Sequence, residues 1–157
     1  MSSTKTQICW ANDQVAFYLS PEIQSHHVFA LMLDTLKRAD ETIISSFAIT
    51  EGWVRRLIRY RQHLGDITLF LDFTVATRNP SNTNFAALNV DRVLLTNNHS
   101  KIIYMRSGDD EMLAVMSNNA TNNQRYESGS IFKNHPVIDI YKKQLVTMKQ
   151  QSAQWMN

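Results

Sequence analysis

Residues 43–73, IISSFAITEGWVRRLIRYRQHLGDITLFLDF, place a helical pattern between two apolar runs. The runs at residues 43–49 and 67–73 contain few polar side chains, which predicts strands buried on both faces of a sheet. Between the runs, Thr50 supplies an N-cap and Gly65 a helix end. The intervening apolar residues form one stripe at helical spacing: Trp53, Leu57, Tyr60 and Leu64. This stretch therefore predicts a β-α-β unit.

The pattern extends to both sides of this unit. Residues 15–19 are β-prone, and Ser20-Pro21 begins a helix whose apolar positions continue to about Arg38. Alternating strands and helices predict an α/β fold, with a central mixed β-sheet flanked by helices on both faces. In the second half we expect a loop at 74–83, a short helix at 84–88, strands at 90–95, 99–105, 112–116 and 126–132, and a final helix from Pro136.

Length and composition narrow the class of protein. The 157 residues are expected to form one domain at 13–157, with residues 1–12 available as a flexible arm. Hydrophobic residues make up 43% and charged residues 19%, which excludes extensive disorder. No run approaches the roughly 20 apolar residues of a membrane span, so we expect no membrane partner. The polar N-terminus and the single cysteine, Cys9, favour the cytoplasm. The net charge of +2 permits an anionic partner without indicating one.

The tripeptide His99-Ser100-Lys101 is the first candidate for chemistry. On an extended strand, His99 and Lys101 point the same way, with Cα atoms roughly 6.5–7 Å apart. An imidazole and an ammonium aimed together suit a phosphoryl group, because one can attack phosphorus while the other balances its charge. A solvated polar strand edge is the alternative interpretation.

An amide-rich segment, SNNATNN at residues 117–123, forms the second candidate. Hydroxyls and amides at a strand exit can hydrogen-bond phosphate oxygens without adding charge. The alternative is an ordinary turn, since Asn118, Asn122 and Asn123 readily adopt the left-handed conformation. Glu127 follows, and a carboxylate bonded to one imidazole nitrogen can orient the ring. Taken alone, Glu127 also fits a surface charge.

Together these residues resemble the motif H-x-K-x4-D-x6-G-S-x-N of the phospholipase D superfamily. The matching residues are His99-Ser100-Lys101, Met116-Ser117-Asn118-Asn119, Glu127 and Gly129. The segment Phe17-Tyr18-Leu19-Ser20-Pro21, the strand ending in Asp72 and the terminal Trp155 extend the similarity over nearly the whole chain. The chain is most similar to the small bacterial nucleases that carry a single such motif. The resemblance implies a phospholipase D-like domain.

The chain departs from this motif at two positions. Arg106 stands where the family has aspartate, whereas counting back six residues from Met116 leads to Asp109. A three-residue insertion in the hairpin would make Asp109 the family's aspartate, which acts mainly as a structural partner there. Met116 replaces the family's glycine and narrows the expected pocket.

The resemblance implies a two-step displacement that needs neither a metal ion nor a cofactor. His99 attacks phosphorus to form a phosphohistidine, which water then hydrolyses. Lys101, Ser117 and Asn119 hold the non-bridging oxygens, and Glu127 orients the imidazole. A second histidine is needed as acid and base, and the chain has one H-x-K motif. The resemblance therefore implies a homodimer in which two copies of His99 share one site.

Nucleic acid is the favoured substrate, with DNA preferred over RNA. Four arginines could contact a phosphate backbone, although a solvated helix face is the alternative: Arg55, Arg56, Arg59 and Arg78. No amphipathic segment reads as a membrane-docking surface. The competing hypotheses are a catalytically degenerate nucleic-acid-binding module, a phosphodiesterase acting on phospholipids or small molecules, and a purely structural partner protein.

Overall fold

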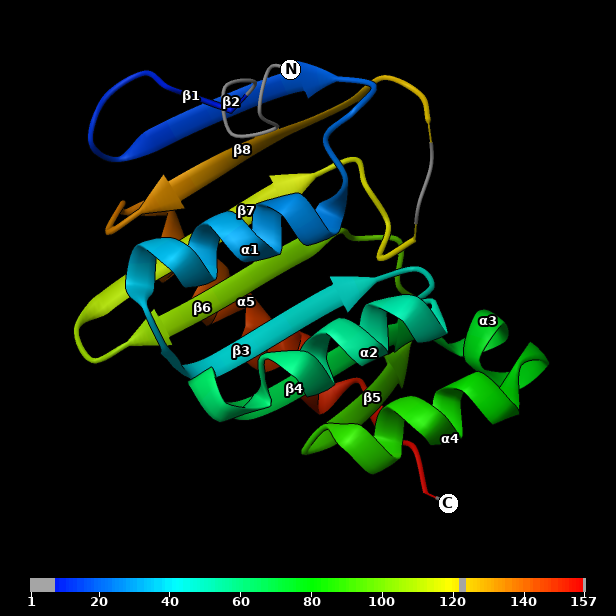
Figure 1. The fold of residues 1–157 in the computed structure, drawn as a ribbon. Helices are drawn as coiled ribbons and strands as arrows, with labels where there is room; N and C mark the ends of the chain where they lie inside the picture. Colours follow the sequence, from blue (N-terminus) through cyan, green and yellow to red (C-terminus); the bar gives the residue numbers. More distant parts are fainter. Residues whose placement is uncertain (1–7, 122–123, 157) are drawn as a thin grey trace.

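The computed structural model describes residues 8–121 and 124–156. Within these ranges a nine-stranded mixed sheet has the order β1-β2-β8-β7-β6-β3-β4-β5-β9 (Figure 1). Its strands are β1 (Cys9–Trp10), β2 (Val15–Ser20), β3 (Ala39–Ser46), β4 (Leu64–Asp72), β5 (Arg92–Thr96), β6 (Ile102–Ser107), β7 (Asp110–Met116), β8 (Glu127–Lys133) and β9 (Ala153–Gln154). The pairs β3–β4 and β4–β5 are parallel, and every other pair in the sheet is antiparallel.

Helices cover both faces of the sheet, which confirms the predicted α/β fold (Figure 1). They are α1 (Ser25–Leu36), α2 (Glu51–Arg59), the 3₁₀ turn η2 (Arg61–His63), α3 (Phe73–Arg78), α4 (Pro80–Asn89) and α5 (Val137–Gln150). In Figure 1, α1 to α4 lie in front of the sheet and α5 lies behind it. Over the described ranges, no helix combines the length and the apolar content that crossing a membrane requires.

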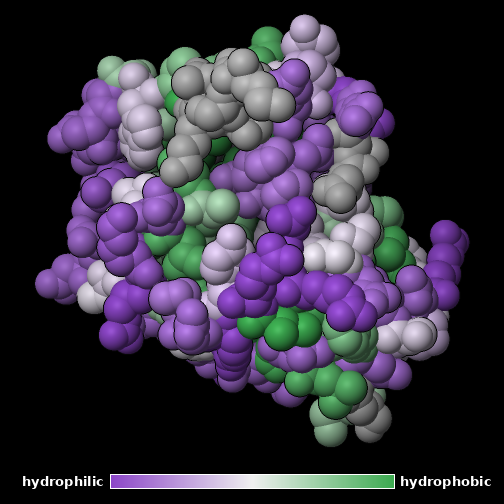
Figure 2. Space-filling view, in the orientation of Figure 1, coloured by the Kyte–Doolittle hydropathy of each residue, from purple (hydrophilic) through white to green (hydrophobic). Residues whose placement is uncertain are grey.

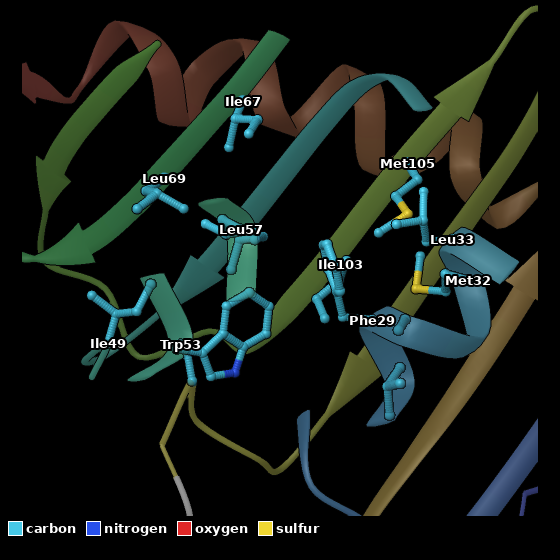
Figure 3. Packing of buried hydrophobic residues seen from close by; sticks show 14 of the residues in the cluster. Phe29, Met32, Leu33, Ile49, Trp53, Leu57, Ile67, Leu69, Ile103 and Met105 are labelled. Carbon is cyan, nitrogen blue, oxygen red and sulfur yellow. The ribbon is translucent and has the colours of Figure 1, made fainter. Parts of the chain in front are cut away.

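The alternation of side chains along the strands produces two cores. On the α1–α2 face, Phe29 and Trp53 meet edge to face with ring centroids 5.2 Å apart. Figure 3 shows these helices packing onto strand residues such as Leu69 and Ile103. The smaller core lies beneath α5 and consists of Ile43, Phe70, Tyr104, Leu113, Ile138 and Leu145. Strand β3 is therefore buried on both faces over residues 42–46, although Thr42, Ser45 and Ser46 interrupt its apolar residues.

Residues 74–83 form helices where a loop was expected, so that expectation is wrong. Asp72 caps α3, its Oδ1 accepting from the N–H of Thr74 at 3.0 Å. Asn79 caps α4 through the N–H of Asn82, and Pro80 begins that helix. The abundance of Thr and Asn in this segment suggested a loop, but Asn79 is a helix cap and the other Thr and Asn residues lie within the two helices.

Part of the expected N-terminal arm belongs to the sheet. Cys9 pairs with Phe17, and Trp10 pairs with Ala16, so β1 extends the sheet beyond β2. Ile8 is buried in the larger core. Residues 1–7 of the expected arm lie outside the described residues.

Gly129 makes room for an aromatic ring at the β2–β8 junction. It pairs with Tyr18 across the two strands, and a Cβ at this position would lie 2.6–2.8 Å from atoms of the Tyr18 ring. Tyr18 is almost fully buried, and its hydroxyl donates to Oδ1 of Asn118. Burial and the charge of Glu127 raise the pKa of Tyr18, so this hydroxyl stays a donor.

We expect Gly129→Ala to lower the free energy of unfolding by about 1–3 kcal/mol, because the tyrosine ring has to move away from Asn118. Gly52→Ala is the matched control: no atom lies within 4 Å of its added Cβ, and α2 gains a better helix former. Urea denaturation followed by circular dichroism measures both variants. Equal stability of Gly129→Ala and the wild type would contradict this packing.

Candidate active site

Five of the six predicted catalytic residues lie at one edge of the sheet, at the right of Figure 1. His99 and Lys101 lie on the segment that leads into β6, whereas Ser117 and Asn119 follow the end of β7. Glu127 is the first residue of β8. Because β6 and β8 run antiparallel to β7, the start of β6, the end of β7 and the start of β8 meet at the same edge.

His99 and Lys101 contact each other directly. Nζ of Lys101 lies 3.1 Å from Nδ1 of His99 and donates to the His99 carbonyl at 2.7 Å. The His99 ring is exposed, and its centroid is 5.3 Å from that of Phe47. Burial lowers the pKa of Lys101, while the charge of Glu127 acts in the opposite direction. Residues 97–101 precede the strand, so local folding of the chain, rather than the predicted strand alternation, brings the two side chains together.

Ser117 and Glu127 form a second contact at this edge. The Ser117 hydroxyl donates to Oε2 of Glu127 and accepts from the N–H of Ser128 at 3.0 Å. Arg125 Nε donates to the other carboxylate oxygen at 3.3 Å. No hydrogen bond joins Glu127 to His99 within the described part of the chain. The orientation of the imidazole by Glu127 therefore stays a prediction.

Asn118 and Asn119 have different surroundings. Asn118 is buried, accepts from the Tyr18 hydroxyl and donates to the carbonyl of Ile23 at 3.0 Å, which is a structural role. The main-chain carbonyl of Asn119 accepts from Ser25 Oγ at 2.8 Å. Its side-chain Oδ1 is buried and, among the described residues, has no hydrogen-bond partner. The predicted turn residues Asn122 and Asn123 lie outside the described residues.

Asn98 anchors the segment that carries His99, and the sequence interpretation missed it. Its buried Nδ2 lies within hydrogen-bond distance of Ser45 Oγ at 3.0 Å, of the Ser46 carbonyl at 3.1 Å and of the Phe70 carbonyl at 3.2 Å. Its Oδ1 accepts from the Ser100 N–H at 3.0 Å. The available signal was its position directly before the H-x-K tripeptide.

Asp72 completes this anchor from the end of β4. Its Oδ2 accepts from the Asn98 N–H at 3.1 Å, while its Oδ1 caps α3. Hydrogen bonds from Thr74, Asn98 and Val75 outweigh burial and hold the Asp72 pKa below its usual range. The carboxylate therefore stays ionised and fixes the start of the His99 segment.

The expectation that Asp109 joins the catalytic group is wrong. Asp109 lies in the turn between β6 and β7, at the opposite end of these strands from Lys101. A six-residue strand separates the two ends by about 20 Å. Arg106 lies near the same turn, with NH1 3.7 Å from Asp40 Oδ2. Motif spacing alone does not specify at which end of a hairpin an added aspartate lies.

The four predicted phosphate-binding arginines do not form one cluster. Arg55 is exposed, bonds Glu51 and lies over the Phe85 ring at 5.4 Å. Arg59 is exposed at the end of α2 that points away from the site edge, about 13 Å along a nine-residue helix. Arg78 ends α3, near the site edge. Figure 2 shows hydrophilic side chains over the α2 region.

Arg56 is half-buried, and two histidines from α1 lie close to it. The rings of His26 and His27 have centroids 4.1 Å apart. The Gln24 N–H donates to His27 Nδ1 at 2.9 Å, which favours a neutral ring. Burial, the charge of His27 and the charge of Arg56 lower the pKa of His26 to about 4. No group of three or more His, Cys, Asp or Glu side chains able to hold a metal occurs within residues 8–121 and 124–156.

Comparison with known proteins gives structural matches only. No protein-family model and no curated protein matches the sequence. NucT from Helicobacter pylori aligns with a TM-score of 0.72 at 14% identity, over 90% of this chain and 99% of NucT. The archaeal chromatin protein TrmBL2, whose structure shows a novel mode of DNA binding, aligns with a TM-score of 0.58 at 10% identity, over 98% and 56% of the two chains.

A third match is phosphatidylserine synthase from Haemophilus influenzae, with a TM-score of 0.60 at 10% identity over 92% of this chain and 41% of the synthase. NucT and the synthase have phospholipase D superfamily folds. The chain therefore has the phospholipase D-like fold, and the predicted resemblance is confirmed at the level of the fold. At such low identities the chemistry has to be argued from the site itself.

The low pKa of His26 predicts a pH dependence of stability. The folded protein keeps His26 neutral down to about pH 4, whereas the unfolded chain takes up the proton near the usual 6.5. The unfolded state therefore binds more protons between these values, and stability falls as the pH falls through this window. Urea midpoints at several pH values measure the effect. His26→Gln should flatten the profile, whereas His63→Gln, an exposed control, should not.

Proposed function

We propose that this protein is a metal-independent phosphodiesterase that cuts nucleic acid through a phosphohistidine on His99, in a site shared by two copies of the chain. The contact between Lys101 Nζ and His99 Nδ1, at 3.1 Å, carries the proposal. It places a positive charge beside an exposed imidazole at the edge where Ser117 and Asn119 supply neutral polar groups. This combination can bind a phosphodiester and attack it.

In the first step, a ring nitrogen of His99 uses its lone pair to form a bond to phosphorus. The bond from phosphorus to the leaving oxygen breaks, and the electron pair goes to that oxygen. Lys101 and the amide of Asn119 stabilise the charge on the non-bridging oxygens. The group of Asn119 that can donate to a phosphate oxygen is Nδ2, because Oδ1 only accepts.

The leaving oxygen needs a proton, and a second imidazole is the group suited to supply it. In the second step, that imidazole takes a proton from water as the water oxygen attacks phosphorus. The bond between phosphorus and His99 then breaks, which regenerates the free ring. His63 on η2 and His135 before α5 lie at the opposite ends of the strands. His26 and His27 lie in the first turn of α1, next to Ser25, but burial lowers the pKa of each ring and disfavours the protonated form that a general acid needs. A second copy of His99 therefore completes the site.

DNA is the proposed substrate. Arg55, Arg59 and Arg78 are exposed and can contact phosphates. The comparison with TrmBL2, a DNA-binding protein of similar fold, supports this choice, as does the comparison with NucT, a nuclease. The similarity to phosphatidylserine synthase keeps a phospholipid substrate as an outcome of the test.

A second candidate is a nucleic-acid-binding module without turnover. One observation favours it: Glu127 bonds Ser117 and Arg125, so within the described residues it does not hold His99. With Asp109 at the far end of the hairpin, no acidic side chain of the motif orients the imidazole in the isolated chain. Such a module would bind DNA and leave it intact.

We expect the wild type to cut plasmid or single-stranded DNA in the presence of EDTA. His99→Ala should reduce the rate by at least about 10³-fold, because the nucleophile is lost, and Lys101→Ala by about 10²–10³-fold. Asp109→Ala, remote from the edge, should retain the wild-type rate. Gel assays measure cutting, and filter binding measures affinity. Binding of DNA without cutting would favour the second candidate. Hydrolysis of phospholipids in vesicles, with no cutting of DNA, would show that the substrate is a phospholipid.

A mixing experiment tests the shared site. Wild-type and His99→Ala chains are co-refolded in varied ratios so that subunits combine at random. If each site needs His99 from both copies, activity should fall as the square of the wild-type fraction, because mixed dimers are inactive. A linear fall would show that each chain carries a complete site and would contradict sharing.

A further inference from the structure

The main chain on both sides of Asn119 is anchored in the body of the protein. Asn118 is buried and is held through its side chain. The Ala120 N–H donates to Ser46 Oγ at 2.9 Å, and the Ala120 carbonyl accepts from the N–H of Thr50 at 3.0 Å. Asn119 therefore lies between two neighbours whose positions the fold determines.

Ser25 contacts the main chain of Asn119 itself. It is the first residue of α1, and its Oγ donates to the Asn119 carbonyl at 2.8 Å. Nε1 of Trp53, on α2, donates to the same Oγ at 2.9 Å. An indole N–H can only donate, so the hydroxyl accepts from Trp53 and directs its one hydrogen to Asn119. The hydroxyl of Ser25 thus links both helices to the segment after β7.

The hydroxyl of Ser25 is not needed to begin α1. Gln24 and His27 form the capping box of this helix, in which the Gln24 N–H donates to His27 Nδ1 at 2.9 Å. Both hydrogen bonds of the Ser25 hydroxyl lead out of α1. Its role is therefore to connect separate elements and not to cap its own helix.

Trp53 gives this hydroxyl a fixed partner. The Trp53 side chain is buried, and its ring packs edge to face against Phe29 (Figure 3). Its main-chain N–H bonds to Thr50, the N-cap residue of α2 that also holds the Ala120 carbonyl. Movement of the indole would disturb the larger core, so the position of Trp53 fixes the position of the Ser25 hydroxyl.

The Asn119 amide depends more on its position than the Lys101 ammonium does. A hydrogen bond needs a donor–acceptor distance of about 2.7–3.2 Å and weakens steeply at angles below about 120°. The interaction of a charge falls only with the inverse of distance. A shift of about 1 Å in the Asn119 main chain would therefore break the amide contact with a phosphate oxygen and largely preserve the contact of Lys101.

We propose that Ser25 is a positioning residue of the active site. Its hydroxyl, directed by Trp53, holds the Asn119 main chain so that Nδ2 of Asn119 can donate to a phosphate oxygen. Ser25 is 2% exposed, so it acts through Asn119 and does not touch the substrate. The inference rests on the proposed function, and it adds residues of α1 and α2 to a site whose other members lie between residues 99 and 127.

A double-mutant cycle measures whether Ser25 acts through Asn119. Asn119→Ala should slow DNA cutting about 10²-fold, because a donor to the transition state is lost. Ser25→Ala should slow it about tenfold, and Trp53→Phe, which keeps a buried ring without the N–H, should have a smaller effect. In the Asn119→Ala background, Ser25→Ala should cause no further loss, because the amide that it positions is absent. Rate reductions that multiply would overturn the inference.

Unfolding measurements separate positioning from stability. Asn119→Ala retains the main-chain carbonyl, so Ser25→Ala should lower stability equally in both backgrounds, as measured by urea denaturation. Thr35→Ala is the matched control, because it removes a hydroxyl that donates to the Leu31 carbonyl at 2.7 Å on the same helix, about 15 Å from Ser25. It should retain the wild-type rate. Equal rate losses in Thr35→Ala and Ser25→Ala would assign the effect to the stability of α1 instead.

Binding of inorganic phosphate tests the same link without turnover. Nuclear magnetic resonance of isotope-labelled protein follows the titration, and loss of binding in Lys101→Ala assigns the ion to the His99 edge. The dissociation constant should rise about three- to tenfold in Ser25→Ala, with no further rise when Asn119→Ala is also present. A protein that shows this cycle but cuts no DNA supports the positioning role while the proposed function fails. Unchanged phosphate binding in Ser25→Ala overturns the inference, as does a wild type that neither binds phosphate at this edge nor cuts DNA.

Discussion

The buried amide of Asn98 is the contact on which the candidate site depends. It reaches the ends of β3 and β4 and the backbone of Ser100, and the carboxylate of Asp72 holds its own N–H. Each of these buried groups destabilises the fold when it loses its hydrogen-bond partner. The hydrogen bonds around Asn98 therefore form together and are lost together. The parallel strands thereby fix where the His99 segment crosses from β5 into β6. Without the hydrogen bonds of Asn98, nothing would hold this irregular segment in the conformation that brings the His99 imidazole and the Lys101 ammonium together.

Much of the fold follows from periodicity. The mostly apolar β4 requires burial on both faces, and Trp53 and Leu57 of α2 require burial on one. The predicted helix was too long, because α2 ends at Arg59, and Leu64 and Gly65 belong to β4. Periodicity did not predict helices α3 and α4, because these helices are marked by their N-cap residues and not by an apolar stripe. Asp72 and Asn79 hydrogen-bond the first turns, but the same residue types also favour loops, and the sequence does not distinguish the two. The position of Asp109 could be derived from the sequence, because the predicted strands at 99–105 and 112–116 already place it in the turn between them, away from His99.

The sequence predicted which residues lie at the site better than it predicted the contacts between their side chains. His99, Lys101, Ser117, Asn119 and Glu127 share one edge because strand ends meet there, which topology dictates. The pairing of Glu127 with Ser117 and Arg125 depends on side-chain geometry that no spacing rule contains. The same limit separates fold from chemistry: a nuclease and a phospholipid synthase share this sheet, and local groups decide what each does.

The short contact between Lys101 and His99 determines the tautomer of the resting imidazole. An ammonium has only hydrogens to offer, so at 3.1 Å Nδ1 of His99 acts as the acceptor, and the neutral ring carries its hydrogen on Nε2. The unliganded chain thus keeps the nucleophilic lone pair engaged and presents a proton donor instead. An arriving anion would draw the ammonium toward its own oxygens, which releases the lone pair on Nδ1 for attack on phosphorus. Phosphate binding would then also release the nucleophilic lone pair. Without substrate, that lone pair stays bonded to Lys101 and is less able to react with other electrophiles.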